Sequence, residues 1–147
     1  MRILLIGGRG KVALHFTRLA SQNGHTIISQ IRSASHASDL SKQGPGKIES
    51  IVASLEDLTV SELTSIFKKQ NPEVIVFAAG SGGKGGRERT MKVDRDGAIK
   101  VFDAIEQCNF TLSEFRRFLL VSAVDVRDTE KTKPSWYSPE ELVVVTY

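Results

Sequence analysis

The chain lacks several features by which common protein classes are identified. Cys108 is the only cysteine, so no disulfide can form within the chain. The apolar start at residues 3–6 is too short for a signal peptide or a membrane span. The net charge of +3 would attract a phosphorylated ligand but does not by itself argue for a nucleic-acid or membrane partner. With 147 residues of ordinary composition, we expect one cytoplasmic domain with an ordinary core.

Motifs for metal, hydrolytic and nucleotide-triphosphate chemistry are also missing. His15, His25 and His36 have no metal-ligand spacing with one another or with Cys108, so we assign no metal. No nucleophile-elbow motif occurs, which disfavours a hydrolase. Lys84 lies in a glycine-rich stretch but is followed by Gly85, which departs from the Walker A pattern. That stretch, with Arg87 and Arg89 after it, is interpreted either as a phosphate or acidic-substrate contact or as a surface loop.

What the chain does have is a regular alternation of strand and helix patterns. Such alternation indicates a parallel sheet covered on both faces, a doubly wound α/β fold of Rossmann type with strand order 3-2-1-4-5. We expect this domain at residues 1–124 and a charged tail at 125–147. The strands are predicted at residues 2–6, 25–31, 47–52, 74–80 and 118–122. The helices are predicted between Gly10 and Asn23, near 38–43, from Thr59 to a stop at Asn71, and at about 88–107.

Apolar spacing predicts which residues of the helices face inward. Thr59 and Glu62 have the spacing of a capping box at the start of one helix. Asp94 and Asp96 are expected to be solvated or paired with neighbouring cations. The inward positions are predicted at Val12, Phe16, Leu19 and Ala20, at Leu63, Ile66 and Phe67, and at Met91, Ala98, Val101, Phe102 and Ile105.

A glycine-rich turn, "GGRGKVA", joins the first strand to the first helix. Its spacing, Gly7-x-x-Gly10-x-x-Ala13, is a relative of the dinucleotide-binding fingerprint. Glycine lets the backbone approach phosphate, and the helix N-terminus offers free amides. We therefore predict a pyrophosphate site, with a tight turn that binds no ligand as the alternative. The predicted cofactor residues here are Gly7, Gly8, Arg9, Gly10, Lys11, Val12 and Ala13.

The end of the second strand distinguishes between the two nicotinamide cofactors. NAD sites usually place an acidic residue there for the ribose 2′-hydroxyl. This chain instead has Arg32 and Ser33, and the Arg32 guanidinium matches the geometry of a 2′-phosphate. Arg9 could add a second contact. The pattern favours NADP over NAD, with a solvated surface arginine as the alternative.

Four stretches together resemble the atypical short-chain dehydrogenase/reductases, in their NmrA-like or epimerase-like branch. These are "LLIGGRGKVA", "VFAAG", "VDRDGAIKVFDAIEQC" and "FLLVSAVDV", and the resemblance covers about residues 1–126. It implies an NAD(P)-binding domain with oxidoreductase or epimerase chemistry.

The resemblance also implies roles for residues outside the glycine loop. Ala78, Ala79 and Gly80 would line the cofactor cleft. Ser54, with Leu55 beside it, takes the place of the family's adenine-contacting aspartate. Ser122 lies near the family's catalytic serine, whose hydroxyl orients a substrate carbonyl, but it is equally consistent with a serine bonded to backbone at a strand end.

The chain departs from the family at its catalytic pair, Tyr-x-x-x-Lys. Tyr137 is followed at that spacing by Glu141, and Tyr147 is the last residue. Family members also continue into a substrate-binding region, of which 125–147 would be a remnant. The chain is therefore interpreted as the cofactor domain of an enzyme acting on an unknown small molecule, a non-catalytic NADP(H) sensor, or an inactive truncated product. An open fifth strand would favour a homo-oligomer.

Overall fold

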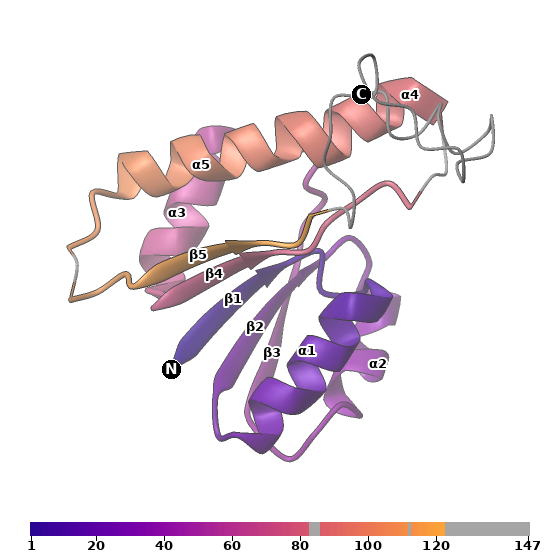
Figure 1. Cartoon of the computed structure of the whole chain (residues 1–147), viewed down its shortest axis with the longest axis vertical. Helices are drawn as coiled ribbons and strands as arrows, with labels where there is room; N and C mark the ends of the chain where they lie inside the picture. The colour runs from indigo at the N-terminus through magenta and orange to yellow at the C-terminus, as the bar shows by residue number, and fades with distance from the viewer. Residues whose placement is uncertain (83–85, 112, 123–147) are drawn as a thin grey trace, which may run out of the picture.

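The computed structural model describes residues 1–82, 86–111 and 113–122, and its centre is a parallel five-stranded sheet. The strand order is β3-β2-β1-β4-β5, which confirms the predicted Rossmann-like topology (Figure 1). The chain reverses direction across the sheet between β3 and β4, so that β1 and β4 are neighbours. The strands are β1 (Arg2–Ile6), β2 (Thr26–Ile31), β3 (Ile48–Val52), β4 (Val74–Phe77) and β5 (Arg117–Leu120).

Helices cover both faces of this sheet (Figure 1). On one face lie α1 (Lys11–Gln22) and α2 (Ala37–Ser41), the latter preceded by a 3₁₀ turn, η1 (Ala34–His36). On the other face lie α3 (Val60–Gln70) and α5 (Asp96–Cys108). The helix predicted at 88–107 is interrupted: α4 (Gly86–Thr90) and α5 are joined by a π-helical segment, η2 (Met91–Arg95).

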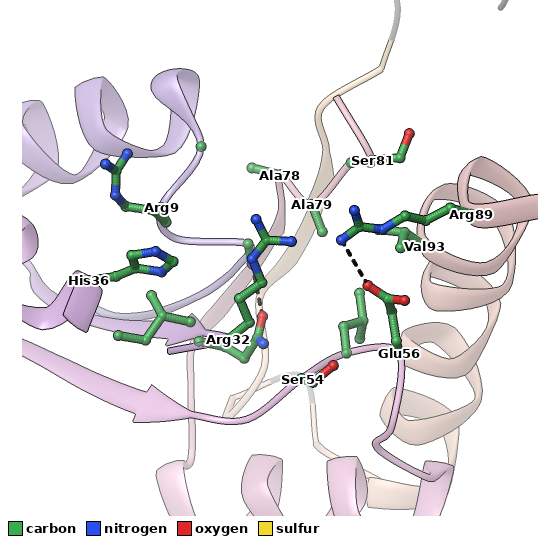
Figure 2. Close-up of a pocket in the computed structure, with 16 residues that line it drawn as sticks. Arg9, Arg32, His36, Ser54, Glu56, Ala78, Ala79, Ser81, Arg89 and Val93 are labelled. Carbon is green, nitrogen blue, oxygen red and sulfur yellow. Dashed lines mark hydrogen bonds and ion pairs between the residues drawn. The ribbon is translucent and has the colours of Figure 1, made fainter. Parts of the chain in front are cut away.

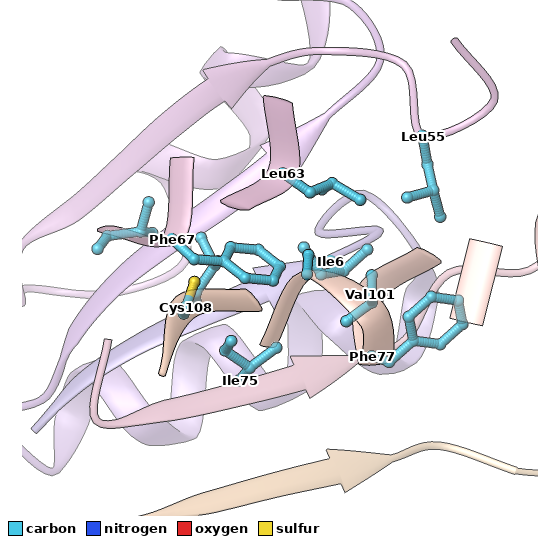
Figure 3. Close-up of a cluster of buried hydrophobic side chains, with 11 residues drawn as sticks. Ile6, Leu55, Leu63, Phe67, Ile75, Phe77, Val101 and Cys108 are labelled. Atoms are coloured by element: carbon cyan, nitrogen blue, oxygen red, sulfur yellow. The ribbon is translucent and has the colours of Figure 1, made fainter. Parts of the chain in front are cut away.

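The apolar strands supply two cores, one on each face of the sheet. In β1, Leu4 and Ile6 face α3 and α5, whereas Ile3 and Leu5 face α1. A strand buried on both faces is expected to be continuously apolar, as β1 is. The larger core, drawn in Figure 3, joins β1 and β4 to α3 and α5 through Ile6, Leu55, Leu63, Phe67, Ile75, Phe77, Val101 and Cys108.

The predicted capping box at the start of α3 is confirmed. The Glu62 amide donates to Thr59 Oγ1 over 3.3 Å, and the Thr59 amide donates to Glu62 Oε2 over 2.8 Å. The Thr59 amide and the Thr59 hydroxyl both donate to the Glu62 carboxylate, and these two hydrogen bonds lower the pKa of Glu62. At the other end Asn71, with φ of +44°, terminates the helix before Pro72.

Some predicted inward positions are wrong. Val12 and Leu19 are 58% and 55% exposed, because α1 packs on the sheet through a neighbouring stripe of small residues. Phe102 is 47% exposed, although its ring lies against Phe118 of the edge strand β5, with ring centroids 4.7 Å apart. The buried stripe of α1 consists of Ala13, Thr17, Ala20 and Ser21.

The β5 edge leaves apolar side chains in solvent. Leu119, Leu120 and Val121 are 39%, 50% and 44% exposed. Among the described residues no strand pairs with the outer side of β5. The predicted tail at 125–147 lies outside the described residues. No helix in the described part of the chain is both long and apolar enough to span a membrane.

Candidate functional site

A pocket of about 410 Å³ opens at the carboxyl ends of β1, β2, β3 and β4. This is the crevice at which open α/β sheets bind ligands, where the strand order reverses. Figure 2 shows its lining side chains converging from loops that follow these strands. Nine residues predicted from the sequence line it: Gly7, Arg9, Gly10, Arg32, Ser54, Leu55, Ala78, Ala79 and Gly80.

The glycines of the β1–α1 loop are not equivalent. Gly7 has φ of +79°, and a Cβ there would lie 2.5 Å from Ala79 Cα, so the fold itself requires glycine. A Cβ on Gly8 would lie 2.6 Å from that of Ser29. On Gly10 the nearest atom would be Gly7 O at 3.5 Å, an ordinary contact. The fold therefore does not need glycine at position 10, and close approach of a ligand gives a reason for it.

Gln30, a buried polar residue at the end of β2, holds this loop in place. Its Oε1 accepts from the Gly7 amide over 3.0 Å, and its Nε2 donates to the carbonyl oxygen of Ala53 after β3. The Gln30 carbonyl also accepts from the Gly8 amide over 2.9 Å. One side chain thus connects the ends of three adjacent strands beneath the pocket. The sequence prediction missed Gln30, although a glutamine inside an apolar strand was a usable signal.

The N-terminus of α1 opens beside the glycine loop. Gly10 is its N-cap and supplies no side-chain hydrogen bond, and its first turn contains no acidic residue. Uncapped first-turn amides and the helix dipole favour an anion at this position. Lys11, Val12 and Ala13 do not line the pocket, so any contact they make to a ligand would come from backbone amides.

Three guanidinium groups lie around the pocket. Arg9 Nε pairs with Asp39 Oδ2 of α2 at 2.9 Å, and Arg89 Nη2 pairs with Glu56 Oε1 at 3.1 Å. Arg32, immediately after β2, has no partner among the described residues. In Figure 2 its side chain reaches into the pocket between His36 and Arg89.

The loop after β3 forms another wall of the pocket, and α5 holds it in place. Lys100 Nζ donates to the carbonyl oxygens of Leu55 and Leu58 over 2.6 and 2.8 Å. A Cβ on Gly97 would come within 2.9 Å of Leu55 Cδ2, so glycine there allows the loop to pack against the helix. Ser54, Leu55 and Glu56 are thereby presented to the pocket.

The segment after β4 is held by η2. The Ser81 amide donates to Asp94 Oδ1 over 2.7 Å, and the Ser81 and Thr90 hydroxyls lie 3.0 Å apart. Burial raises the pKa of Asp94, and the hydrogen bond from Ser81 opposes that rise. Asp94 is exposed, as expected of a solvated carboxylate, and it also holds the segment after β4 through Ser81, whereas Asp96 pairs with Arg95 at 2.6 Å.

Several predicted site residues lie away from the pocket lining. Ser33 caps η1, where its hydroxyl accepts from the Ser35 amide. Ser122 follows β5 and is exposed. Besides Gln30, the pocket contains Ile31, His36, Glu56 and Val93, which the sequence analysis did not assign to a site. It also contains Ser81 and Arg89 of the basic, glycine-rich stretch that the sequence analysis singled out. No group of three metal-ligating side chains comes together in the part of the chain that is described.

The chain can be compared with known proteins on this basis. It is 38% identical to the UPF0659 protein C216.03 of Schizosaccharomyces pombe over 139 residues, 95% of this chain and 53% of the relative. It is 30% identical to the uncharacterized sugar epimerase YhfK of Bacillus subtilis over 131 residues, 88% of this chain and 56% of the relative. The chain therefore spans a little over half of the length of these relatives.

A solved structure is also similar to this chain. A Bacillus halodurans protein, named provisionally as an NAD-dependent epimerase/dehydratase, superposes with a TM-score of 0.73 at 28% identity, covering 99% of this chain and 59% of that one. The model of the NAD(P)H-binding family matches residues 7–145. The glycine loop, the uncapped helix and the pocket at the strand reversal are what such a match requires of the structure. The chain therefore belongs to the NAD(P)H-binding family.

Proposed function

We propose that this NAD(P)-binding domain takes NADP(H) in preference to NAD(H). The observation that carries the proposal is Arg32, a guanidinium without a described partner at the end of β2. In this fold the ribose of the adenosine half lies at that position. A guanidinium there pairs with a 2′-phosphate, and an acidic side chain would instead accept from a 2′-hydroxyl.

The two other arginines that line the pocket each hold a carboxylate. Arg9 pairs with Asp39, and Arg89 pairs with Glu56. The residue after Arg32 is Ser33, whose hydroxyl caps η1. No carboxylate therefore stands directly after β2 to receive the ribose hydroxyl as in an NAD site, which supports NADP(H).

We further propose that the domain is the cytoplasmic cofactor half of an atypical short-chain dehydrogenase/reductase, acting as an oxidoreductase or epimerase on a small molecule. NADP(H), when bound, supplies or accepts a hydride. The glycine loop and α1 would hold the pyrophosphate, and the segment after β4 would lie beside the nicotinamide ribose. Ser122 stays a prediction as the serine that orients a carbonyl, and Tyr137 and Tyr147 lie outside the described residues.

The test is the ratio of NADPH to NADH affinity in Arg32→Ala. A hydrogen bond to a charged group contributes roughly 1.5–3 kcal/mol, so the NADP preference should fall about tenfold or more. Dissociation constants for both cofactors are measured by calorimetry on the same protein preparation, so that incomplete folding cancels from the ratio.

Arg116→Ala is the matched control, because it removes the same charge next to β5 at the opposite end of the strands. It should leave the ratio unchanged. If Arg32→Ala kept the wild-type ratio, Arg32 would be a surface residue and the NADP assignment would be wrong.

A further inference from the structure

The three asparagines of the chain all lie at helix ends. Asn23, Asn71 and Asn109 are the C-terminal caps of α1, α3 and α5. Asn71 and Asn109 have φ of +44° and +52°, the left-handed conformation in which many helices end. Asn23 keeps φ of −88°, and the next residue, Gly24, takes a positive φ of +75° instead. The three asparagines therefore occupy equivalent positions but differ in local backbone.

The residue that follows each asparagine decides whether its side chain can react with the backbone. The reaction is attack of the following amide nitrogen on the side-chain carbonyl carbon. The asparagine of α3 is followed by Pro72, which has no N–H to give up. That of α5 is followed by Phe110, whose ring stacks on Phe115 with centroids 5.4 Å apart. That of α1 is followed by Gly24, which has no Cβ to hinder the attack.

The turn from α1 into β2 leaves the reacting groups of Asn23 and Gly24 in solvent. Both residues are exposed, and one hydrogen bond holds each reacting group. Asn23 Nδ2 donates to the Leu19 carbonyl oxygen over 2.8 Å, and the Gly24 amide donates to that of Ser21 over 3.0 Å. Both bonds belong to the last turn of α1, and helix ends open at much lower cost than the core. Fraying of this one turn therefore releases both groups.

We propose that Asn23 is a site of spontaneous deamidation, an inference independent of the proposed function. The Gly24 amide nitrogen loses its proton to hydroxide and bonds to Cγ of Asn23. The side-chain nitrogen takes a proton from water and leaves as ammonia, and a five-membered succinimide ring remains. Water then opens the ring at either carbonyl. One opening gives aspartate, and the other gives isoaspartate, in which the main chain runs through the former side chain.

Either product weakens the end of α1. A carboxylate cannot donate to the Leu19 carbonyl oxygen, so one hydrogen bond of the last turn is lost. The C-terminal end of a helix carries a partial negative charge, and the last turn of α1 contains no basic residue to offset a new carboxylate. In Figure 1 this turn lies at the end of the sheet opposite to the carboxyl ends of the strands, where the pocket opens. The modification therefore acts on the stability of the fold, at a place remote from the pocket.

The experiment incubates the full chain at mildly alkaline pH, folded in buffer and unfolded in urea, and follows each asparagine by peptide mass spectrometry. In the folded protein the peptide with Asn23 should change in mass from the amide to the acid and should yield both aspartate and isoaspartate. The peptides with Asn71 and Asn109 are internal controls and should stay unchanged over the same time. Asn23→Gln should abolish the reaction, because its longer side chain would have to close a larger ring.

If the Asn23 peptide stayed intact in the folded protein, the proposal would be wrong, and conversion in urea alone would show that the fold protects the site. Equal conversion at Asn109 would overturn it as well, since Gly24 would then not decide the reactivity. Asn23→Asp supplies one of the products directly and should unfold at a lower urea concentration than the wild type. An unchanged midpoint in that variant would overturn the effect on α1.

Discussion

Gly7 and Gly10 of the β1–α1 loop lie in different surroundings. The backbone of Gly7 lies against the end of β4, and its φ of +79° is costly for any other residue. Gly10 has φ of −60° and ψ of 151°, which most residues adopt, and has room for a methyl group. Stability accounts for glycine at position 7, whereas at position 10 we propose that close approach of a ligand is the reason.

We predict opposite consequences for two substitutions that each add one methyl group. Gly7→Ala should lower the free energy of unfolding by about 2 kcal/mol or more, through backbone strain and the clash with Ala79. Gly10→Ala should change it by less than about 1 kcal/mol but weaken NADPH binding at least about fivefold, since overpacking costs about 1–3 kcal/mol. Denaturant unfolding and calorimetry on both variants check this. Unchanged affinity in Gly10→Ala would mean that the loop does not approach phosphate.

The sequence made some of these residues predictable and others not. The places of Gly7 and Arg32 in the pocket lining could be predicted, because both residues lie next to a strand end. Glu56 could not, because its orientation depends on Arg89, which is 33 residues later. Lys100 was equally hidden, since its three carbonyl partners lie more than 40 residues earlier in the chain.

Among the elements, η2 differs most from its prediction. Apolar spacing predicted one continuous helix at 88–107, but residues Met91–Arg95 form a π-helical turn. Such turns occur frequently at functional sites. Here the turn lies where Val93 lines the pocket and Asp94 accepts from Ser81. A wider turn does not appear in the spacing of apolar residues, so the sequence could not indicate it.

We predict a pH-dependent stability difference between the wild type and Asp94→Asn. Burial raises the pKa of Asp94, so the folded protein favours the neutral carboxyl. Below the ordinary Asp pKa of about 3.9 that group is neutral in both folded and unfolded chains. As the pH rises through the raised folded-state pKa, ionisation destabilises the wild type relative to the uncharged variant.

Urea unfolding of both proteins between about pH 3 and pH 7 measures this difference. The contributions of the other acidic groups to the pH dependence cancel, because both proteins contain them. The free energy of unfolding of Asp94→Asn should increase relative to that of the wild type as the pH rises, and the difference should then stay constant. The opposite trend would show that the Ser81 hydrogen bond outweighs burial at Asp94.

Across the whole molecule, the strand order could be predicted because right-handed crossovers leave few arrangements for alternating strands and helices. The positions of the exposed apolar side chains could not be predicted from the sequence, because they depend on how each helix is rotated on the sheet. On α1 the small residues Ala13 and Ala20 face the sheet, and the larger Leu19 faces solvent. At β5, apolar residues point to both faces, as in an interior strand, although the strand is at an edge.

We propose that this edge pairs with a second copy of the chain. Exposed apolar side chains on a strand whose outer side pairs with no other described strand favour strand-to-strand association. The apparent mass should therefore rise with concentration in light scattering. Leu120→Lys should lower that rise, because an edge lysine opposes pairing. Leu19→Lys, at a similarly exposed leucine on α1, is the matched control and should leave the rise in apparent mass unchanged. A constant monomer mass at high concentration in the wild type would contradict the proposal.

The hydrogen bonds of Gln30 have a consequence for the timing of ligand capture. Its side chain and carbonyl hold the amides of Gly7 and Gly8 through contacts made by the protein alone. A loop held in this way would need no slow ordering before the dinucleotide that we propose binds to it. Diffusion and charge then govern how fast the dinucleotide is captured, and differences in affinity among variants of this site arise mainly in how long it stays.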